Sequence, residues 1–81
     1  MRALDGQVAI SVRHISEVDG RGPVVNLLAT ETATSWERHY ELEIGTEVAF
    51  GSRWQYRLSV TRAGRKYPGF AEIHVRGPIE P

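Results

Sequence analysis

The chain has 81 residues, with ten basic and ten acidic side chains and a formal net charge of zero. This length allows one small domain, and a hydrophobic fraction of 41% without net charge argues against a disordered chain. The absence of cysteine excludes a disulfide scaffold, a thiolate metal site and cysteine catalysis. We therefore expect one domain at residues 1–76, followed by a flexible tail at 77–81.

The first predicted strand lies near the N-terminus, where apolar residues occur at every second position. Val8, Ile10 and Val12 alternate with polar or small residues, as in a strand with one buried face. A turn signal with two glycines and a proline follows at 19–23. The next strand, 24–30, is apolar on both faces and is predicted to be central or covered.

Residues 30–35 are compatible with a loop or with one helical turn. The strand predicted at 36–44 alternates apolar and polar positions, but Arg38 interrupts its apolar face. We expect Arg38 to stack on an aromatic ring at the rim of the core, or to turn outward at a bulge. A short strand at 47–50 follows, bracketed by turn signals.

The last two predicted strands lie at 53–61 and 70–76, and both alternate with period two. Four aromatic residues share the parity of the apolar faces and are predicted to fill the interior rather than line a ligand cavity: Trp36, Tyr40, Trp54 and Tyr56. Six strands at regular spacing, without an amphipathic helix, predict an all-β fold, a small antiparallel six-stranded barrel or sandwich.

Charge is divided unevenly along the chain. Residues 1–52 contain four arginines and eight acidic residues, a net charge of −4, whereas residues 53–81 carry a net charge of +4. We expect the acidic face of the strand at 36–44 to pair with the basic face of the strand at 53–61 within one sheet.

The candidate catalytic and metal-binding residues do not form a recognisable motif. His39 lies between Glu37 and Glu41, and His74 is two residues from Glu72. These are pairs, whereas a zinc site needs roughly three or four converging groups. No serine lies in a Gly-x-Ser-x-Gly motif, and no glycine-rich loop precedes a helix. We therefore expect no enzymatic activity, no metal and no cofactor.

No stretch reaches the roughly 20 apolar residues of a membrane helix, and the N-terminus lacks the apolar core of a secretory signal. These features favour a cytoplasmic protein without a membrane partner.

With catalysis and metal binding unexpected, the remaining class of function is binding to another molecule. A chain this short, without disulfides and with unpaired sheet edges, is stabilised by association. We predict a non-catalytic protein-binding or accessory module that forms a homodimer, for example an inhibitor, an immunity protein or a structural subunit. The alternative is a barrel that binds a small ligand or single-stranded nucleic acid, although zero net charge makes a nucleic acid partner unexpected.

The expected edges for association are residues 24–28 and the strand that contains Phe70. The predicted interaction surface consists of Val25, Leu27, Arg38, Arg53, Arg57, Tyr67 and Phe70.

Overall fold

The computed structural model describes residues 1–20, 22–64 and 69–79, and within these ranges it contains seven strands and no helix. The strands are β1 (Arg2–Ala3), β2 (Val8–Val18), β3 (Gly22–Glu31), β4 (Trp36–Glu43), β5 (Glu47–Phe50), β6 (Tyr56–Gly64) and β7 (Phe70–Arg76). The described ranges hold no helix with the length and apolar character needed to cross a membrane.

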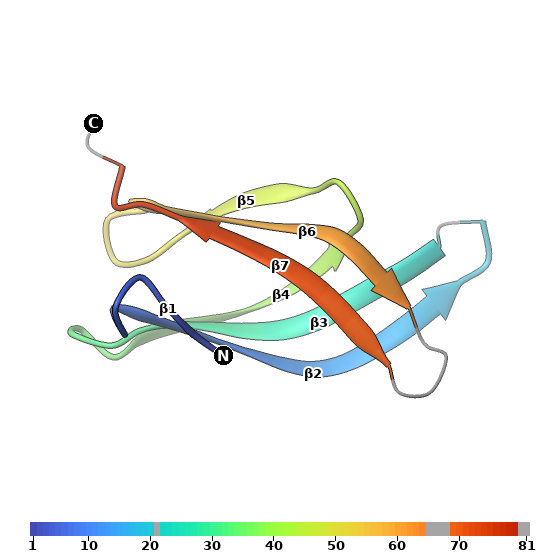
Figure 1. Cartoon of the computed structure of the whole chain (residues 1–81), viewed down its shortest axis with the longest axis horizontal. Helices are drawn as coiled ribbons and strands as arrows, with labels where there is room; N and C mark the ends of the chain where they lie inside the picture. The colour runs from blue at the N-terminus through green and yellow to red at the C-terminus, as the bar shows by residue number, and fades with distance from the viewer. Residues whose placement is uncertain (21, 65–68, 80–81) are drawn as a thin grey trace.

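The strands form two antiparallel sheets that face each other across the core (Figure 1). One sheet has four strands in the order β1-β2-β3-β4, and the other has three in the order β5-β6-β7. The all-β prediction is confirmed. A closed six-stranded barrel is not found, because the described strands form two separate sheets and β1 adds a seventh strand.

Strand β3 lies inside the four-stranded sheet, with β2 on one side and β4 on the other. The prediction of a central or covered strand at 24–30 is therefore confirmed. The expectation that residues 24–28 form an edge for association is wrong, because their backbone groups already face two neighbouring strands. Val25 and Leu27 are fully buried in the core and have no surface to offer a partner.

A β-bulge explains why β2 departs from its predicted pattern. The register with β3 shifts between Val12 and His14, so Arg13 has no partner residue on β3. An extra residue reverses the alternation of side chains beyond it. Ile10 and Ile15 therefore both pack toward the core, although an uninterrupted alternation would place them on opposite faces. Val12, just before the bulge, is 43% exposed.

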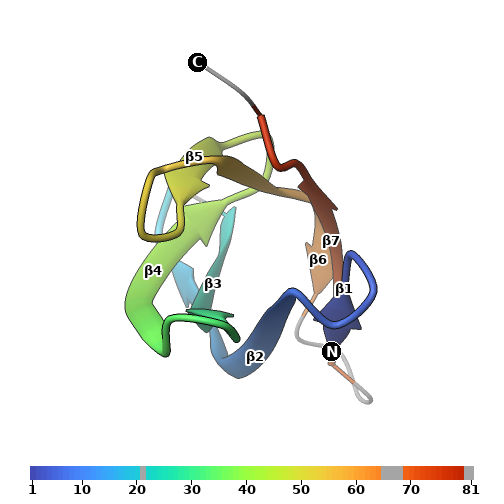
Figure 2. The same cartoon turned by 90° about the vertical axis from the view of Figure 1, so that its left-hand side faces the viewer.

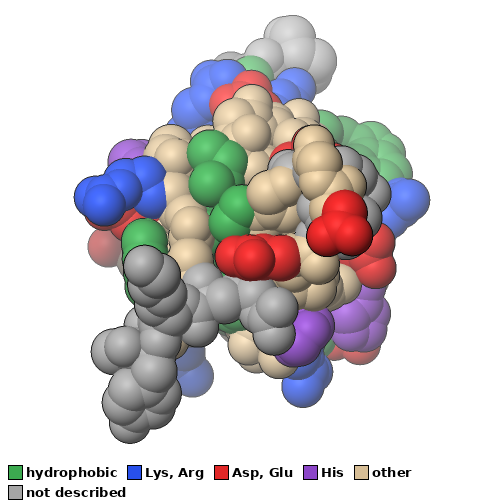
Figure 3. Space-filling model, turned by 90° about the vertical axis from the view of Figure 1, so that its right-hand side faces the viewer, with side chains coloured by type: hydrophobic (Ala, Val, Ile, Leu, Met, Phe, Trp, Pro, Cys, Tyr) green, Lys and Arg blue, Asp and Glu red, His purple; other side chains and the backbone are tan. Residues whose placement is uncertain are grey.

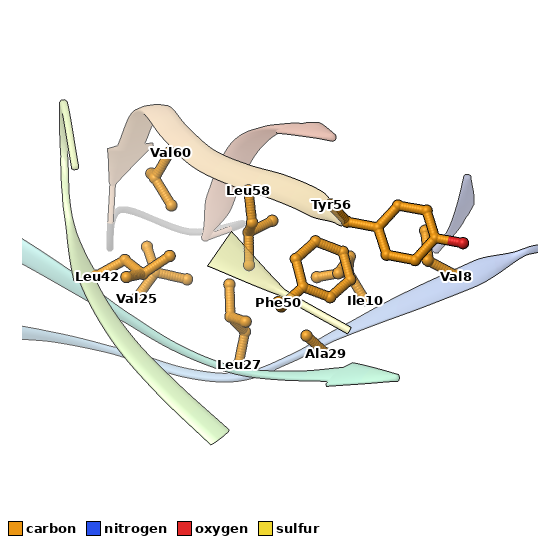
Figure 4. Packing of buried hydrophobic residues seen from close by; sticks show 10 residues of the cluster. All are labelled: Val8, Ile10, Val25, Leu27, Ala29, Leu42, Phe50, Tyr56, Leu58 and Val60. Carbon is orange, nitrogen blue, oxygen red and sulfur yellow. The ribbon is translucent and has the colours of Figure 1, made fainter. Parts of the chain in front are cut away.

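The core lies between the sheets and is built from alternate residues of five strands (Figure 4). Its buried members are Val8, Ile10, Val25, Leu27, Ala29, Leu42, Phe50, Tyr56, Leu58 and Val60. Phe50 is fully buried, and its ring centroid lies 5.3 Å from that of Tyr56. Each large aliphatic side chain buried in this way contributes about 1.5–3 kcal/mol of transfer free energy, which makes this cluster the main source of stability.

The predicted charge pairing is wrong, because β4 and β6 belong to different sheets. Two ion pairs between described residues lie instead within the three-stranded sheet. Arg76 contacts Glu47 at 3.1 Å, and Arg62 contacts Glu72 at 3.8 Å. These pairs are solvent-exposed, so each is worth about 0–1 kcal/mol.

The segment at 30–35, for which the sequence left a loop or a helical turn open, is resolved by the structure. Residues 32–35 form a turn between β3 and β4 rather than a helical turn, and the Thr32 backbone N–H donates to the Gln7 carbonyl at 2.9 Å.

At the C-terminus, the Ile79 backbone N–H donates to the Gln55 carbonyl at 2.6 Å. A flexible tail stays a prediction, and residues 80 and 81 lie outside the described part of the chain.

Candidate functional site

Three loops gather at one end of the molecule: residues 4–7 between β1 and β2, residues 32–35 between β3 and β4, and residues 51–55 between β5 and β6 (Figure 2). The described non-glycine residues with positive φ all lie in these loops: Leu4, Asp5, Ser35 and Trp54. Such conformations cost free energy and concentrate at functional sites. This end of the molecule is therefore the strongest candidate for a site.

The opposite end has a different character. Figure 3 shows acidic side chains near the centre of that face, histidine toward its lower part, and Lys or Arg side chains around its rim. Arg38, Arg53 and Arg57 lie at or near the loop end.

The loop at 51–55 is anchored by the buried side chain of Glu31, at the end of β3. Glu31 is only 5% exposed, and its Oε1 accepts hydrogen bonds from the Ser52 backbone N–H at 2.8 Å and the Ser52 hydroxyl at 2.9 Å. The Gln55 side-chain amide donates to the same oxygen at 3.4 Å. The Ser52 N–H is the largest cause of a lowered Glu31 pKa, and it outweighs the opposing effect of desolvation.

The same loop is fixed internally, which holds Trp54 in one place. The Trp54 backbone N–H donates to the Gly51 carbonyl at 3.0 Å, and the Arg53 N–H donates to Gln55 Oε1 at 2.9 Å. The Arg57 guanidinium donates to the Trp54 carbonyl at 2.7 Å. Trp54 has a φ of 56° and is 49% exposed, so the loop holds a large aromatic ring at the surface in a strained backbone conformation.

Trp54 is part of an aromatic and cationic stack. Its ring meets that of Trp36 edge to face, with centroids 5.7 Å apart and an interplanar angle of 82°. The Arg38 guanidinium carbon lies 5.6 Å from the Tyr40 ring centroid and 5.8 Å from the Trp54 ring centroid. The prediction that Arg38 stacks on an aromatic ring is thus confirmed, and both rings lie within the range of a cation–π contact.

Tyr40 connects this stack to the core. Its hydroxyl donates to the Ala49 carbonyl of β5 at 2.9 Å, which ties β4 to the second sheet. Burial raises the pKa of Tyr40, and the nearby positive charge of Arg38 partly opposes that increase. The ring on which Arg38 rests is therefore held in position and stays neutral at physiological pH.

We call this group the Trp54 surface; it consists of Arg38, Arg53, Trp54 and Arg57. Among the described residues, none of its three guanidinium groups has a carboxylate partner, whereas Arg62 and Arg76 each have one. The three positive charges near the exposed tryptophan are thus not balanced by a described carboxylate, and one guanidinium nitrogen of Arg57 is bonded to the Trp54 and Tyr56 carbonyls.

The structure separates the residues of the predicted interaction surface. Arg38, Arg53 and Arg57 come together around Trp54. Val25 and Leu27 lie in the core and are wrong as members of a surface. Phe70 is 45% exposed at the start of β7, with the Arg62 guanidinium 5.7 Å from its ring. Tyr67 lies outside the described residues.

The sequence analysis did not identify two residues of this region: it placed Trp54 in the core, and it did not single out Glu31. Trp54 was expected in the core because its parity matches that of Tyr56, but β6 begins only at Tyr56 and Trp54 lies in the loop before it. The turn signal at 51–52 is compatible with a longer loop. Glu31 falls in the uncertain segment 30–35, and no local pattern indicates that it is buried.

A cleft of about 400 Å³ opens beside the same loops, and its lining includes Asp5, Gln7, Glu31 and Tyr56. The Tyr56 hydroxyl donates to Gln7 Oε1 at 3.2 Å. The Ser52 hydroxyl is bonded to Glu31, but a carboxylate with a lowered pKa is a weak base for activating a hydroxyl. This pair is therefore poorly suited to nucleophilic catalysis.

The predicted histidine pairs do not extend into larger clusters. Within residues 1–20, 22–64 and 69–79, no group of three or more histidine, aspartate or glutamate side chains could hold a metal ion. His39 and His74 both lie exposed on strands. Comparisons of the chain with models of protein families, with curated proteins and with solved structures gave no match.

Proposed function

We propose that the chain is a non-catalytic protein-binding module whose Trp54 surface docks on an acidic segment of a partner protein. The observation that carries this proposal is an exposed tryptophan in a strained, hydrogen-bonded loop, surrounded by three guanidinium groups that lack a carboxylate partner among the described residues. An inhibitor, an immunity protein or an accessory subunit would use a surface of this kind.

The composition of the Trp54 surface supports a protein partner. Tryptophan, tyrosine and arginine dominate the residues that carry most of the binding energy at protein interfaces. Arg38 already rests between two rings, so it loses less conformational freedom on binding than a free side chain would. Guanidinium groups bind carboxylates in a bidentate manner, which favours aspartate and glutamate in the partner.

Single-stranded nucleic acid is the second candidate, because an exposed ring beside arginines can stack on a base. Such surfaces usually present several aromatic rings along the path of the strand. Here the neighbouring rings of Trp36 and Tyr40 are half-buried, Phe70 begins β7 at the end opposite the 51–55 loop, and the net charge of the chain is zero. These features favour protein over nucleic acid. A ligand inside the fold is disfavoured by the buried side chains that fill the core.

A peptide selection tests the proposal. We expect the wild-type chain to enrich acidic peptides from a phage-displayed random library, and Trp54→Ala and Arg38→Gln to lose this enrichment. Arg13→Gln serves as the control, because Arg13 is an exposed arginine at the bulge of β2. Enrichment of basic or uncharged peptides, or equal enrichment by Trp54→Ala, would overturn the proposal. Quenching of tryptophan fluorescence by oligothymidylate at low salt in the wild type, and its absence in Trp54→Ala, would support the second candidate.

We further propose that the module self-associates. A small chain without disulfides buries a modest share of its surface on folding. Pairing of a free sheet edge with a second copy would increase the buried surface. The position of β7 at the end of its sheet supports this part of the proposal.

A further inference from the structure

Strand β7 has one unpaired edge. It is the last strand of its sheet, and among the described residues it pairs only with β6. The bulge in this ladder lies in β6, between Val60 and Arg62, so β7 itself runs without an extra residue. Strand β7 also contains neither proline nor lysine, which commonly protect edges from pairing.

The other described edges are less suited to pairing. β1 has only two residues, the part of β2 that extends beyond β1 has a bulge at Arg13, and β5 has only four residues. On β4, the Tyr40 hydroxyl reaches across to the Ala49 carbonyl of β5. An antiparallel β4 pair centred on His39 would also place Glu37 opposite Glu41, which repel each other.

The two faces of β7 differ in character. Ala71, Ile73 and Val75 are half-buried and pack against the core. The residues between them are exposed: Phe70, Glu72, His74 and Arg76. A strand added to the free edge would extend both the apolar face and the polar face.

We infer that β7 pairs antiparallel with β7 of a second copy of this chain, about a two-fold axis at Ile73. This inference rests on the self-association proposed above and names its surface. In this register Ala71 lies opposite Val75 of the second copy, and Ile73 lies opposite its own counterpart, so the apolar faces are continuous. On the exposed face Glu72 lies opposite His74 of the second copy, which pairs a carboxylate with an imidazole.

Neighbouring registers are less favourable. A shift by one residue would place apolar side chains opposite polar ones and break the common face. A two-fold axis at Glu72 would bring two carboxylates together. An axis at His74 would leave Phe70 and Ala71 without partners within the strand. The register at Ile73 is therefore the one in which all residues of β7 pair and no like charges meet.

An exchange of two side chains tests this register. We expect the wild-type chain to sediment as a dimer with a concentration-dependent monomer fraction. His74→Glu places like charges opposite each other twice per dimer and should weaken dimerisation about tenfold or more. The double variant Glu72→His/His74→Glu restores a carboxylate–imidazole pair in this register and should recover most of the affinity, because the Arg62–Glu72 ion pair that it removes is exposed and contributes little.

A matched control separates this effect from a general effect of charge. His39→Glu adds the same charge to an exposed histidine on β4 and should leave the dimer intact. Circular dichroism and tryptophan fluorescence check that each variant folds. Amide hydrogen exchange gives an independent readout, because the β7 amides should become more protected as protein concentration rises.

Several outcomes would overturn the inference. These are a wild-type chain that stays monomeric at every concentration, a dimer unaffected by His74→Glu, and a double variant that fails to recover affinity. Failure here is distinguishable from failure at the Trp54 surface. Trp54→Ala should leave the dimer unchanged, and monomeric His74→Glu should still select acidic peptides.

Discussion

Glu31 and Ser52 are 21 residues apart in the chain and are joined by three hydrogen bonds. The Ser52 backbone N–H donates to Oε1 at 2.8 Å, and its hydroxyl donates to Oε1 at 2.9 Å and to Oε2 at 3.2 Å. Glu31 ends β3 in one sheet, and Ser52 lies in the loop between two strands of the other. This contact therefore couples the sheets at the end of the molecule that displays Trp54.

The variant Glu31→Gln should destabilise the protein by about 1–3 kcal/mol, because it weakens charge-assisted hydrogen bonds in a buried position. Urea unfolding measures this change. The 51–55 loop should also become more mobile. The tryptophan emission maximum should then move to longer wavelength, as Trp54 becomes more exposed to solvent. Glu37→Gln, an exposed change on β4, is the control and should alter stability by less than about 0.5 kcal/mol. Equal effects of the two variants would contradict the anchoring role of Glu31.

Acid should weaken the same contact. The Glu31 pKa is lowered in the folded state from its ordinary value of 4.5, so the folded state favours the ionised form. The stability contribution is therefore fully present above pH 4.5 and is lost as the pH falls through the folded-state pKa. Unfolding free energies measured from neutral pH to acid should fall more steeply for the wild type than for Glu31→Gln. Identical pH profiles would show that Glu31 is not a source of the acid sensitivity.

Period-two alternation predicted the larger part of the fold. It is correct for β6, where Tyr56, Leu58 and Val60 are buried. For β3 a run that is apolar on both faces correctly predicted a central strand. The pattern failed at the bulge that follows Val12, where one added residue moves the core-facing positions out of phase, from Ile10 to Ile15. Local periodicity does not reveal such a residue.

The sequence predicted less of the candidate site than of the fold. The stacking of Arg38 was predictable, because an arginine on an apolar face needs an aromatic ring or an outward turn. The exposure of Trp54 depends on the start of β6, and the burial of Glu31 depends on Ser52 in the other sheet. Both are tertiary relationships, and neither is present in the neighbouring residues of the chain.

Alkaline conditions should affect the contact between β4 and β5. Burial raises the Tyr40 pKa above its ordinary value of 10.0, so the folded state favours the neutral phenol that donates to Ala49. The stability contribution is present below pH 10.0 and is lost as the pH rises through the folded-state pKa. Tyr40→Phe should cost about 0.5–1.5 kcal/mol at neutral pH and remove this alkaline loss. An absorbance titration of tyrosinate and urea unfolding check both effects. If Tyr40→Phe left the alkaline profile of stability unchanged, another group would be responsible.

Gly51 should be the least replaceable of the glycines at the turns. It has a φ of 100°, and a Cβ there would lie 2.8 Å from both Tyr56 Cδ2 and Gln55 Oε1. Gly51→Ala combines backbone strain with displacement of a core ring, and we expect a loss of about 2–4 kcal/mol. Gly45→Ala is the matched control, because Gly45 has a φ of 89° but no atom within 4 Å of the position that its methyl group would take. It should cost only the strain, about 1 kcal/mol. Urea unfolding distinguishes the two, and equal losses would mean that the packing of Tyr56 against this loop contributes little.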